Sequence, residues 1–392
     1  MPAKNSPKKK SAHLKVLYFL AFVLALAAAM PAYVESSYIK QFVGVGWVSL
    51  FFLGANLATF VAILYFPGII KKYRNNRTSE AVLFFYFLAL VLMSVVQSAV
   101  GVFIAFALLI VASTLIWINM DVFVESYSSN SSTGKTRTLF FTFLNLGWIV
   151  APFISSYFIE LSGYRIVYLA AALALAIFYV LFIKKNRELI DRNKYQKLNG
   201  LETVKKICRR KNLRGIFAVA ILLNTFYSLA VIYIPLHLLQ NVGFCWETMG
   251  LMFSFMLLPF VLFELPAGIL ADKYWGEKEM LYIGISILFI SLLLFFGLDT
   301  KNALIWGAVL FFSRIGAALV EAMRETYFFK IVDAEDLSLI DFFRTSIPLG
   351  YILGTGLGVL VTLVLPINYI FLVFALIILS GFYFISIIKD TK

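Results

Sequence analysis

A single arginine, Arg314, lies in the middle of an apolar stretch that runs from Ala303 to Met323. It stands about twelve residues into this stretch, which corresponds to a depth of roughly 18 Å if the stretch is helical. An arginine at the centre of a membrane helix costs about 2.5–3.5 kcal/mol, so it is expected to face a cavity or a partner. We therefore predict that Arg314 binds an anionic or polar group of a substrate, or couples to a nearby acid. A structural ion pair, for example with Glu321, is the alternative.

Acidic residues inside or beside other apolar stretches are candidates for carrying protons. Glu264 lies within the stretch Thr248–Leu270, where a changing distance to a cation such as Arg314 could control its protonation. Two further pairs of acids have a spacing of four residues, which places both side chains on one helical face: Asp121 with Glu125, and Glu321 with Glu325. We predict Glu264, Glu321 and Asp121 as proton-coupling candidates. The alternatives are a structural role for Glu264 and salt bridges at a cytoplasmic gate for the four paired acids.

Neutral polar residues also interrupt the apolar stretches. Apolar pockets with a few placed hydrogen-bonding groups are typical of small-molecule sites. We therefore expect a substrate cavity to be lined by Asn56, Thr114, Asn145, Asn224 and Tyr227. Hydrogen bonding between helices is the alternative for each of them. Gly350, Gly354 and Gly358 repeat every four residues and predict a face on which two helices pack closely.

The elements that must position these residues are membrane helices. Of the 392 residues, 61% are hydrophobic and only 14% charged, and the mean hydropathy is +0.90. Soluble domains have about 45–50% apolar and about 25% charged residues, so the composition excludes most soluble enzymes. A membrane helix needs roughly 20 apolar residues. Twelve such segments are predicted: Leu14–Val34, Trp47–Ile70, Glu80–Ser98, Val100–Met120, Leu139–Leu161, Tyr164–Ile183, Gly215–Ile234, Thr248–Leu270, Met280–Leu298, Ala303–Met323, Ser346–Leu365 and Tyr369–Ile388.

The charge distribution predicts the orientation of these segments. The chain has 34 Lys and Arg against 21 Asp and Glu, a net charge of +13. With twelve crossings, 30 of the 34 basic residues fall on the side of both termini, and the other side has only Lys40, Arg165 and Lys301. Cytoplasmic loops carry such an excess. Both termini are therefore predicted to be cytoplasmic, and the basic excess indicates orientation rather than a nucleic-acid partner. The expected partner is the lipid bilayer that the spans cross.

The two halves of the chain align at an offset of about 200 residues. Val43–Trp47 aligns with Val242–Trp246, and the pair Asp121 and Glu125 aligns with Glu321 and Glu325. We predict an all-α membrane protein made of two pseudosymmetric six-helix bundles. The expected boundaries are a basic tail at 1–13, a first bundle at 14–183, a cytoplasmic linker at 184–214, a second bundle at 215–388 and a cytoplasmic end at 389–392.

The turn after the eighth segment carries a family resemblance. It reads Gly268-Ile269-Leu270-Ala271-Asp272-Lys273-Tyr274-Trp275-Gly276-Glu277-Lys278, which resembles the loop motif Gly-x-Leu-x-Asp-Arg-x-Gly-x-Lys of major facilitator superfamily transporters. The segment Leu146–Ser156, with Gly147 and Pro152, is similar to the antiporter motif of that family, although Ala151, Ser155 and Ser156 replace its glycines. We expect Gly147 and Pro152 to pack against a neighbouring helix.

The resemblance implies a cytoplasmic gate in the second half of the chain. In the family the motif aspartate holds this side of the protein closed, and its predicted partner here is Arg324 at the end of the tenth segment. A solvated loop aspartate is the alternative. The implied gate comprises Gly268, Asp272, Lys273, Gly276, Arg324, Glu125 and Glu325. The equivalent loop of the first half departs from the motif, because Lys72 stands where Asp272 stands in the second half.

The sequence contains no phosphate loop, metal-ligand spacing or nucleophile constellation, so we expect neither an enzyme nor a bound cofactor or metal. The leading hypothesis is a secondary-active transporter of a small organic solute that works by alternating access, is coupled to protons and exports an amphipathic compound. Import of a sugar-like, amino-acid-like or anionic metabolite is the first alternative. A lipid-handling protein or a non-transporting membrane sensor on the same scaffold is the second. The expected functional unit is a monomer.

Overall fold

The computed structural model describes residues 7–127, 133–186, 200–332 and 337–389, and within these ranges the chain forms helices and no strands. The helices of the first half are α1 (Pro7–Ala32), α2 (Glu35–Ile39), α3 (Val45–Tyr73), α4 (Asn75–Val95), α5 (Ala99–Tyr127), α6 (Thr133–Ser162) and α7 (Tyr164–Asn186). Those of the second half are α8 (Gly200–Arg209), α9 (Lys211–Ser228), η1 (Leu229–Tyr233), α10 (Ile234–His237), η2 (Leu238–Val242), α11 (Trp246–Met256), α12 (Leu258–Lys273), α13 (Glu277–Gly297), α14 (Ala303–Ile331), α15 (Leu337–Phe343), α16 (Ser346–Val364), α17 (Tyr369–Leu379) and α18 (Gly381–Ser386).

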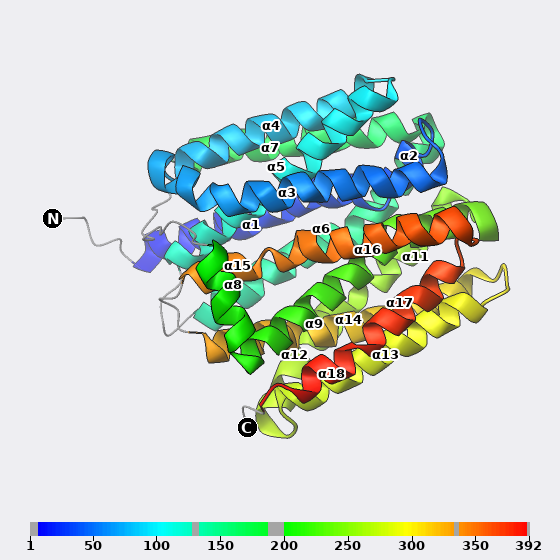
Figure 1. Cartoon of the computed structure of the whole chain (residues 1–392). Helices are drawn as coiled ribbons and strands as arrows, with labels where there is room; N and C mark the ends of the chain where they lie inside the picture. The colour runs from blue at the N-terminus through cyan, green and yellow to red at the C-terminus, as the bar shows by residue number, and fades with distance from the viewer. Residues whose placement is uncertain (1–6, 128–132, 187–199, 333–336, 390–392) are drawn as a thin grey trace.

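Many of the helices are long enough to cross a membrane. In the described residues, eleven helical stretches are long and apolar enough to span a bilayer, and Tyr18–Ala32 of α1 is a shorter apolar helix. The predicted all-α membrane fold is therefore confirmed. Both chain ends lie at one end of the molecule, which we call the termini end, and α2 lies at the opposite end (Figure 1).

The seventh span differs from its prediction. It was expected to end at Ile234, whereas the helical stretch runs from Lys211 to Val242. Two π-helical turns, η1 and η2, flank the short α10, which contains Pro235. A proline has no backbone N–H to donate, so the hydrogen-bond ladder around it has to change, and wider π turns accommodate this without ending the helix.

Two other spans are interrupted. The eighth changes from α11 to α12 at Leu257, just before Pro259, and the twelfth changes from α17 to α18 at Ser380. These interruptions do not alter the number of crossings, because each pair of short helices continues in one direction through the molecule (Figure 1).

The two halves pack by equivalent contacts. In the first half α1 lies against α6 and α4 against α7, and in the second half α9 lies against α16 and α13 against α17. The glycines at equivalent positions sit on these contacts. A Cβ added to Gly147 of α6 would lie 2.8 Å from Ala25 Cβ of α1, and a Cβ added to Gly350 of α16 would lie 2.4 Å from Asn224 Cβ of α9. Close approach of this kind requires a residue without a side chain.

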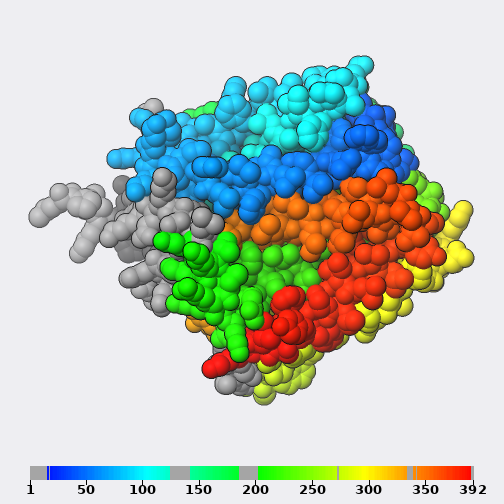
Figure 2. Space-filling view, viewed as in Figure 1, coloured from blue at the N-terminus to red at the C-terminus, as the bar shows by residue number. Residues whose placement is uncertain are grey.

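The two bundles meet along two pairs of helices, α3 with α16 and α6 with α11. Figures 1 and 2 show α3 of the first bundle lying alongside α16 of the second. The contacts are tight at the opposite end. Ser49 Oγ lies 2.7 Å from the Tyr233 hydroxyl, and the indole Nε1 of Trp246 donates to the Tyr164 hydroxyl at 3.0 Å. The bundles are therefore closed against each other at this end.

Candidate functional site

Arg314 lies at the centre of the candidate site. It projects from α14, a helix whose first turn is capped by Asn302, the side-chain oxygen of which accepts from the Leu304 backbone N–H at 2.9 Å. The Arg314 side chain is only 1% exposed. Among the described residues its Nε and Nη1 have no hydrogen-bond partner, and it forms no ion pair with them. The site therefore holds a buried cation with free donors.

Aromatic rings stabilise this cation in place of an anion. The guanidinium carbon of Arg314 lies 5.4 Å from the ring centroid of Phe226 and 6.0 Å from that of Tyr227, both on α9. Each such contact contributes about 0.5–2 kcal/mol, the larger values applying to desolvated pairs. The ring faces attract the positive charge, but they do not accept hydrogen bonds from the N–H groups that lie in the guanidinium plane. An added anionic group would satisfy those donors.

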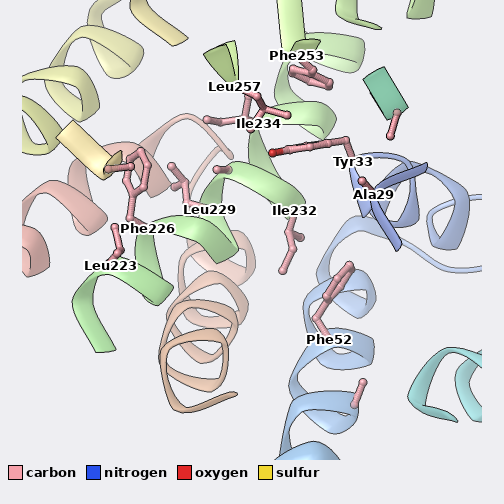
Figure 3. Close-up of a cluster of buried hydrophobic side chains, with 14 of the residues drawn as sticks. Ala29, Tyr33, Phe52, Leu223, Phe226, Leu229, Ile232, Ile234, Phe253 and Leu257 are labelled. Carbon is pink, nitrogen blue, oxygen red and sulfur yellow. The ribbon is translucent and has the colours of Figure 1, made fainter. Parts of the chain in front are cut away.

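The first bundle contributes Tyr33 to the same site. Its hydroxyl is in electrostatic contact with Arg314, and its ring lies 5.2 Å from the ring of Phe253 on α11. Figure 3 shows Tyr33 reaching from the end of α1 toward Ile234 and Leu257 of the second bundle. Arg314 is thus placed where the two bundles meet. Tyr33 also lines a small apolar pocket between α1, α6 and α11, together with Met30, Val34, Pro152, Ser155, Ser156, Trp246, Gly250 and Phe253.

A chain of polar contacts leads from Arg314 toward the termini end. The Tyr227 hydroxyl donates a short hydrogen bond to Glu321 Oε2. Arg324 Nη2 lies 3.8 Å from Glu321 Oε1 and 3.4 Å from Glu325 Oε1. Arg314 and Glu321 are therefore linked through Tyr227, and the described structure contains no direct ion pair between them.

Glu264 of α12 stands beside this chain. It is half-buried, and its carboxyl forms no hydrogen bond or ion pair with the described residues. It is in electrostatic contact with Glu321. Two carboxylates in such contact repel each other when both are charged. The geometry thus brings together the two acids that the sequence proposed separately.

An ion pair joins the bundles at the termini end. Arg344, which follows α15 of the second bundle, pairs with Asp121 of α5 in the first. Glu325 is in electrostatic contact with both residues. Asp121 thus lies in an inter-bundle contact rather than beside Glu264. The Glu125 and Asp272 side chains lie outside the described residues, and the described partners of Arg324 are Glu321 and Glu325.

The remaining loop residues of the implied gate are described only by their backbone and exposure. Gly276 has a φ of 98°, a left-handed conformation that favours glycine, so the turn before α13 depends on this residue. Lys273 is exposed, and a Cβ added to Gly268 would meet no atom within 4 Å. No contact in the described residues therefore explains the glycine at position 268.

Three of the five predicted cavity residues bond to their own helices. Asn56 Nδ2 donates to the Phe52 carbonyl at 2.9 Å, Thr114 Oγ1 to the Ile110 carbonyl at 2.9 Å and Asn224 Nδ2 to the Ala220 carbonyl at 2.8 Å. Such back-bonding satisfies a polar group without a partner helix. Asn145 is half-buried and has no side-chain hydrogen bond within the described residues. Tyr227 alone of the five contacts Arg314.

Three residues of the site were not predicted from the sequence: Tyr33, Phe226 and Arg344. Tyr33 and Phe226 are two of the 60 phenylalanine and tyrosine residues of the chain, 40 Phe and 20 Tyr, so their type carries no signal. Arg344 was counted only as one of the basic residues near the termini. Its position just before the eleventh span, on the same side as Asp121, is the one feature that could have suggested an inter-bundle pair.

Comparison with known proteins settles the family. The sequence profile described as "Major Facilitator Superfamily" matches residues 17–320 and 247–391. The chain belongs to the Major Facilitator Superfamily. Members of this superfamily are membrane transporters, so the chain is a transporter rather than an enzyme. No curated protein sequence matches it significantly.

Solved structures of this superfamily share the fold. The crystal structure of a point mutant of nucleoside transporter NupG has a TM-score of 0.73 at 17% identity, covering 97% of this chain and 100% of that one. A second NupG crystal structure has a TM-score of 0.73 at 15% identity, covering 96% of this chain and 98% of that one. At these identities the likeness shows the superfamily fold and not the solute.

Proposed function

We propose that this superfamily member is a secondary-active transporter, working by alternating access, of a small organic solute that carries an anionic group on an apolar or aromatic body. The observation that carries the proposal is the buried, unpaired guanidinium of Arg314 at the junction of the bundles. A carboxylate or phosphate oxygen would accept the free N–H groups, and a charge-assisted hydrogen bond of this kind is worth about 1.5–3 kcal/mol.

The surroundings of Arg314 support the apolar part of the solute. Phe226, Tyr227 and Tyr33 place aromatic faces and hydroxyls around the guanidinium. Small-molecule sites combine such an apolar lining with a few orienting polar groups. Because Tyr33 belongs to the first bundle and the other residues to the second, a bound solute would touch both. This is the position that a solute needs in order to respond to rocking of one bundle against the other.

We propose protons as the energy source. Glu264 and Glu321 are two acids in electrostatic contact, and Tyr227 links Glu321 to the aromatic residues around Arg314. Protonation of either acid would make the electric potential at Arg314 more positive. Proton binding by these acids and anion binding at Arg314 would therefore influence each other. The partial antiporter motif around Gly147 and Pro152 supports export in exchange for protons as the direction of transport.

The proposed orientation places the termini end in the cytoplasm, supported by the excess of basic residues on that side. The contacts proposed to close this side include the Asp121–Arg344 pair and the loop from Gly268 to Gly276. The proposed division into bundles at 14–183 and 215–388, joined by the linker at 184–214, follows from the repeat. The proposed unit is a monomer, since one chain supplies both bundles and the candidate site between them.

A second candidate is transport of an uncharged solute with an aromatic ring, such as a nucleoside, with import as its direction. The likeness to nucleoside transporter NupG and the aromatic lining favour it. It differs from the first candidate in a testable respect, because it predicts that solutes without an anionic group are carried.

Transport into proteoliposomes tests the proposal. The full-length protein is reconstituted and offered labelled aromatic carboxylates, aromatic phosphates, nucleosides and sugars, with and without an imposed pH gradient. We expect the aromatic anions to move and their accumulation to follow the pH gradient. Movement of nucleosides but not anions supports the second candidate. If no solute class moves, with or without the pH gradient, both candidates are contradicted.

A further inference from the structure

A buried acid that the transport site does not use lies at the opposite end of the protein. Glu35 begins α2, the five-residue helix between the first two spans, and all five residues of this helix are buried. The helix packs against η1 and α10 of the second bundle. On its other side Tyr38 of α2 donates to the Met93 carbonyl of α4, so α2 lies between the two bundles and forms part of the closure at this end.

The carboxyl of Glu35 has no partner to balance a negative charge. The residue is 5% exposed and forms no ion pair or hydrogen bond with the described residues. Its polar neighbours are also unsatisfied, because Ser36 Oγ, Ser37 Oγ and the Tyr168 hydroxyl are buried and lack hydrogen-bond partners in the described part of the chain. Burying an uncompensated carboxylate is far more costly than burying a carboxylic acid.

Phenols from three other helices surround Glu35. The hydroxyls of Tyr86 on α4, Tyr168 on α7 and Tyr351 on α16 are each in electrostatic contact with it. The other titratable or charged groups near α2 are Tyr33, Tyr38, Lys40, Tyr164, Arg165, Tyr233 and His237, and none of them forms an ion pair with Glu35 in the described part of the chain. A carboxylic acid can exchange hydrogen bonds with phenols, whereas the carboxylate would need a cation.

Desolvation also favours the protonated form of Glu35. Burial raises the pKa of Glu35 to about 8, against about 4.5 for an ordinary glutamate. In contact with water, the group would return to its ordinary pKa and release the proton near neutral pH.

We infer that Glu35 is a second proton-binding site, at the end opposite the termini, which is occupied while the bundles are closed around α2 and releases its proton to the solution on that side when they part. The inference rests on the proposed alternating access. It assigns to the first bundle a proton site separate from the Glu264–Glu321 pair of the second. Tyr351, in electrostatic contact with both Glu35 and Arg314, connects the two regions.

The difference in the pKa of Glu35 between the closed and open forms determines how the ratio of closed to open molecules changes with pH. Between the pKa of the open form and that of the closed form, only the closed form holds the proton, so the ratio of closed to open molecules falls by up to tenfold per pH unit. The window is about pH 4.5 to about pH 8. Above this window neither form is protonated and the ratio no longer changes.

A distance measurement in the full-length protein tests the inference. Spin labels are placed on Trp47→Cys in α3 and Leu363→Cys in α16, exposed positions on different bundles near the approach of Gly46 to Thr362. The two native cysteines, Cys208 and Cys245, are exposed and are replaced by serine. We expect one short distance at pH 5 and a growing longer distance by pH 8.5.

Variants distinguish Glu35 from other acids. Glu35→Gln should keep the short distance at both pH values, whereas Glu35→Asp, which retains an acid and guards against a folding failure, should respond as the parent protein does. Glu160→Gln is the matched control, because Glu160 is an exposed acid at the same end of the first bundle, and it should also respond normally. A pH response that persists in Glu35→Gln, or no response in the parent protein, overturns the inference. A normal pH response without transport of any solute contradicts the proposed function and leaves this site standing.

Discussion

Replacing Arg314 by methionine should make the protein more stable while abolishing transport. Two buried donor nitrogens of Arg314, Nε and Nη1, have no acceptor in the described structure, and each unsatisfied donor costs about 1–3 kcal/mol. The contacts with Phe226 and Tyr227 offset this cost by about 0.5–2 kcal/mol each. The difference is on the order of 1–2 kcal/mol, and Arg314→Met should raise the free energy of unfolding by about that amount.

The assay is thermal unfolding in detergent followed by tryptophan fluorescence, at one pH and without added solute. The matched control is Arg324→Met on the same helix. Arg324 is also buried, at 6% exposed, but it lies 3.8 Å from Glu321 and 3.4 Å from Glu325. Its replacement leaves two carboxylates without their cation, so it should lower the midpoint of unfolding. A lower midpoint for Arg314→Met would contradict this expectation, because it would mean that a partner within the protein already stabilises the Arg314 guanidinium.

Three further predictions concern other parts of the molecule. Arg344→Asp should reduce transport by separating the bundles at the termini end, and the double variant Asp121→Arg with Arg344→Asp should restore it in the proteoliposome assay; no restoration would argue against a direct pair. Because the pKa of Glu35 is about 8 in the folded protein and about 4.5 in the unfolded chain, the stability it contributes is complete below about pH 4.5 and is lost as pH rises through 8. The unfolding midpoint should therefore fall over that window in the parent protein and fall less in Glu35→Gln. Gly358→Leu should destabilise the protein by about 1–3 kcal/mol, because even a Cβ at this position would lie 1.7 Å from the Tyr233 hydroxyl, whereas Gly356→Leu, where a Cβ meets no atom within 4 Å, should not.

The membrane fold follows from hydropathy, because each span must cover the apolar bilayer core with about 20 residues and satisfy its own backbone. The ends of the spans follow less well. The seventh span was expected to end at Ile234, but π-helical turns carry the helix to Val242. Local sequence does not determine such turns, because packing of α16 and α2 against this helix also contributes.

The candidate site could be predicted only in part. The depth of Arg314 in its span was sufficient to single it out. The partners of Arg314 depend on how α9 and α1 are rotated about their axes, and one sequence does not fix this rotation, so Phe226 and Tyr33 were missed. Glu35 was missed for a different reason. It lies in a short connection between spans, and its burial depends on tertiary packing against helices of both bundles.

In the proposed alternating-access cycle, one site at Arg314 is exposed in turn to the two sides of the membrane. Counterflow in proteoliposomes detects this alternation, because a labelled solute then moves against unlabelled solute without a net driving force and only through a carrier that alternates. With an aromatic carboxylate found in the transport screen, we expect transient accumulation by the parent protein and none by Arg314→Gln. Equal accumulation by Arg314→Gln, or simple equilibration without a transient by the parent protein, would contradict it.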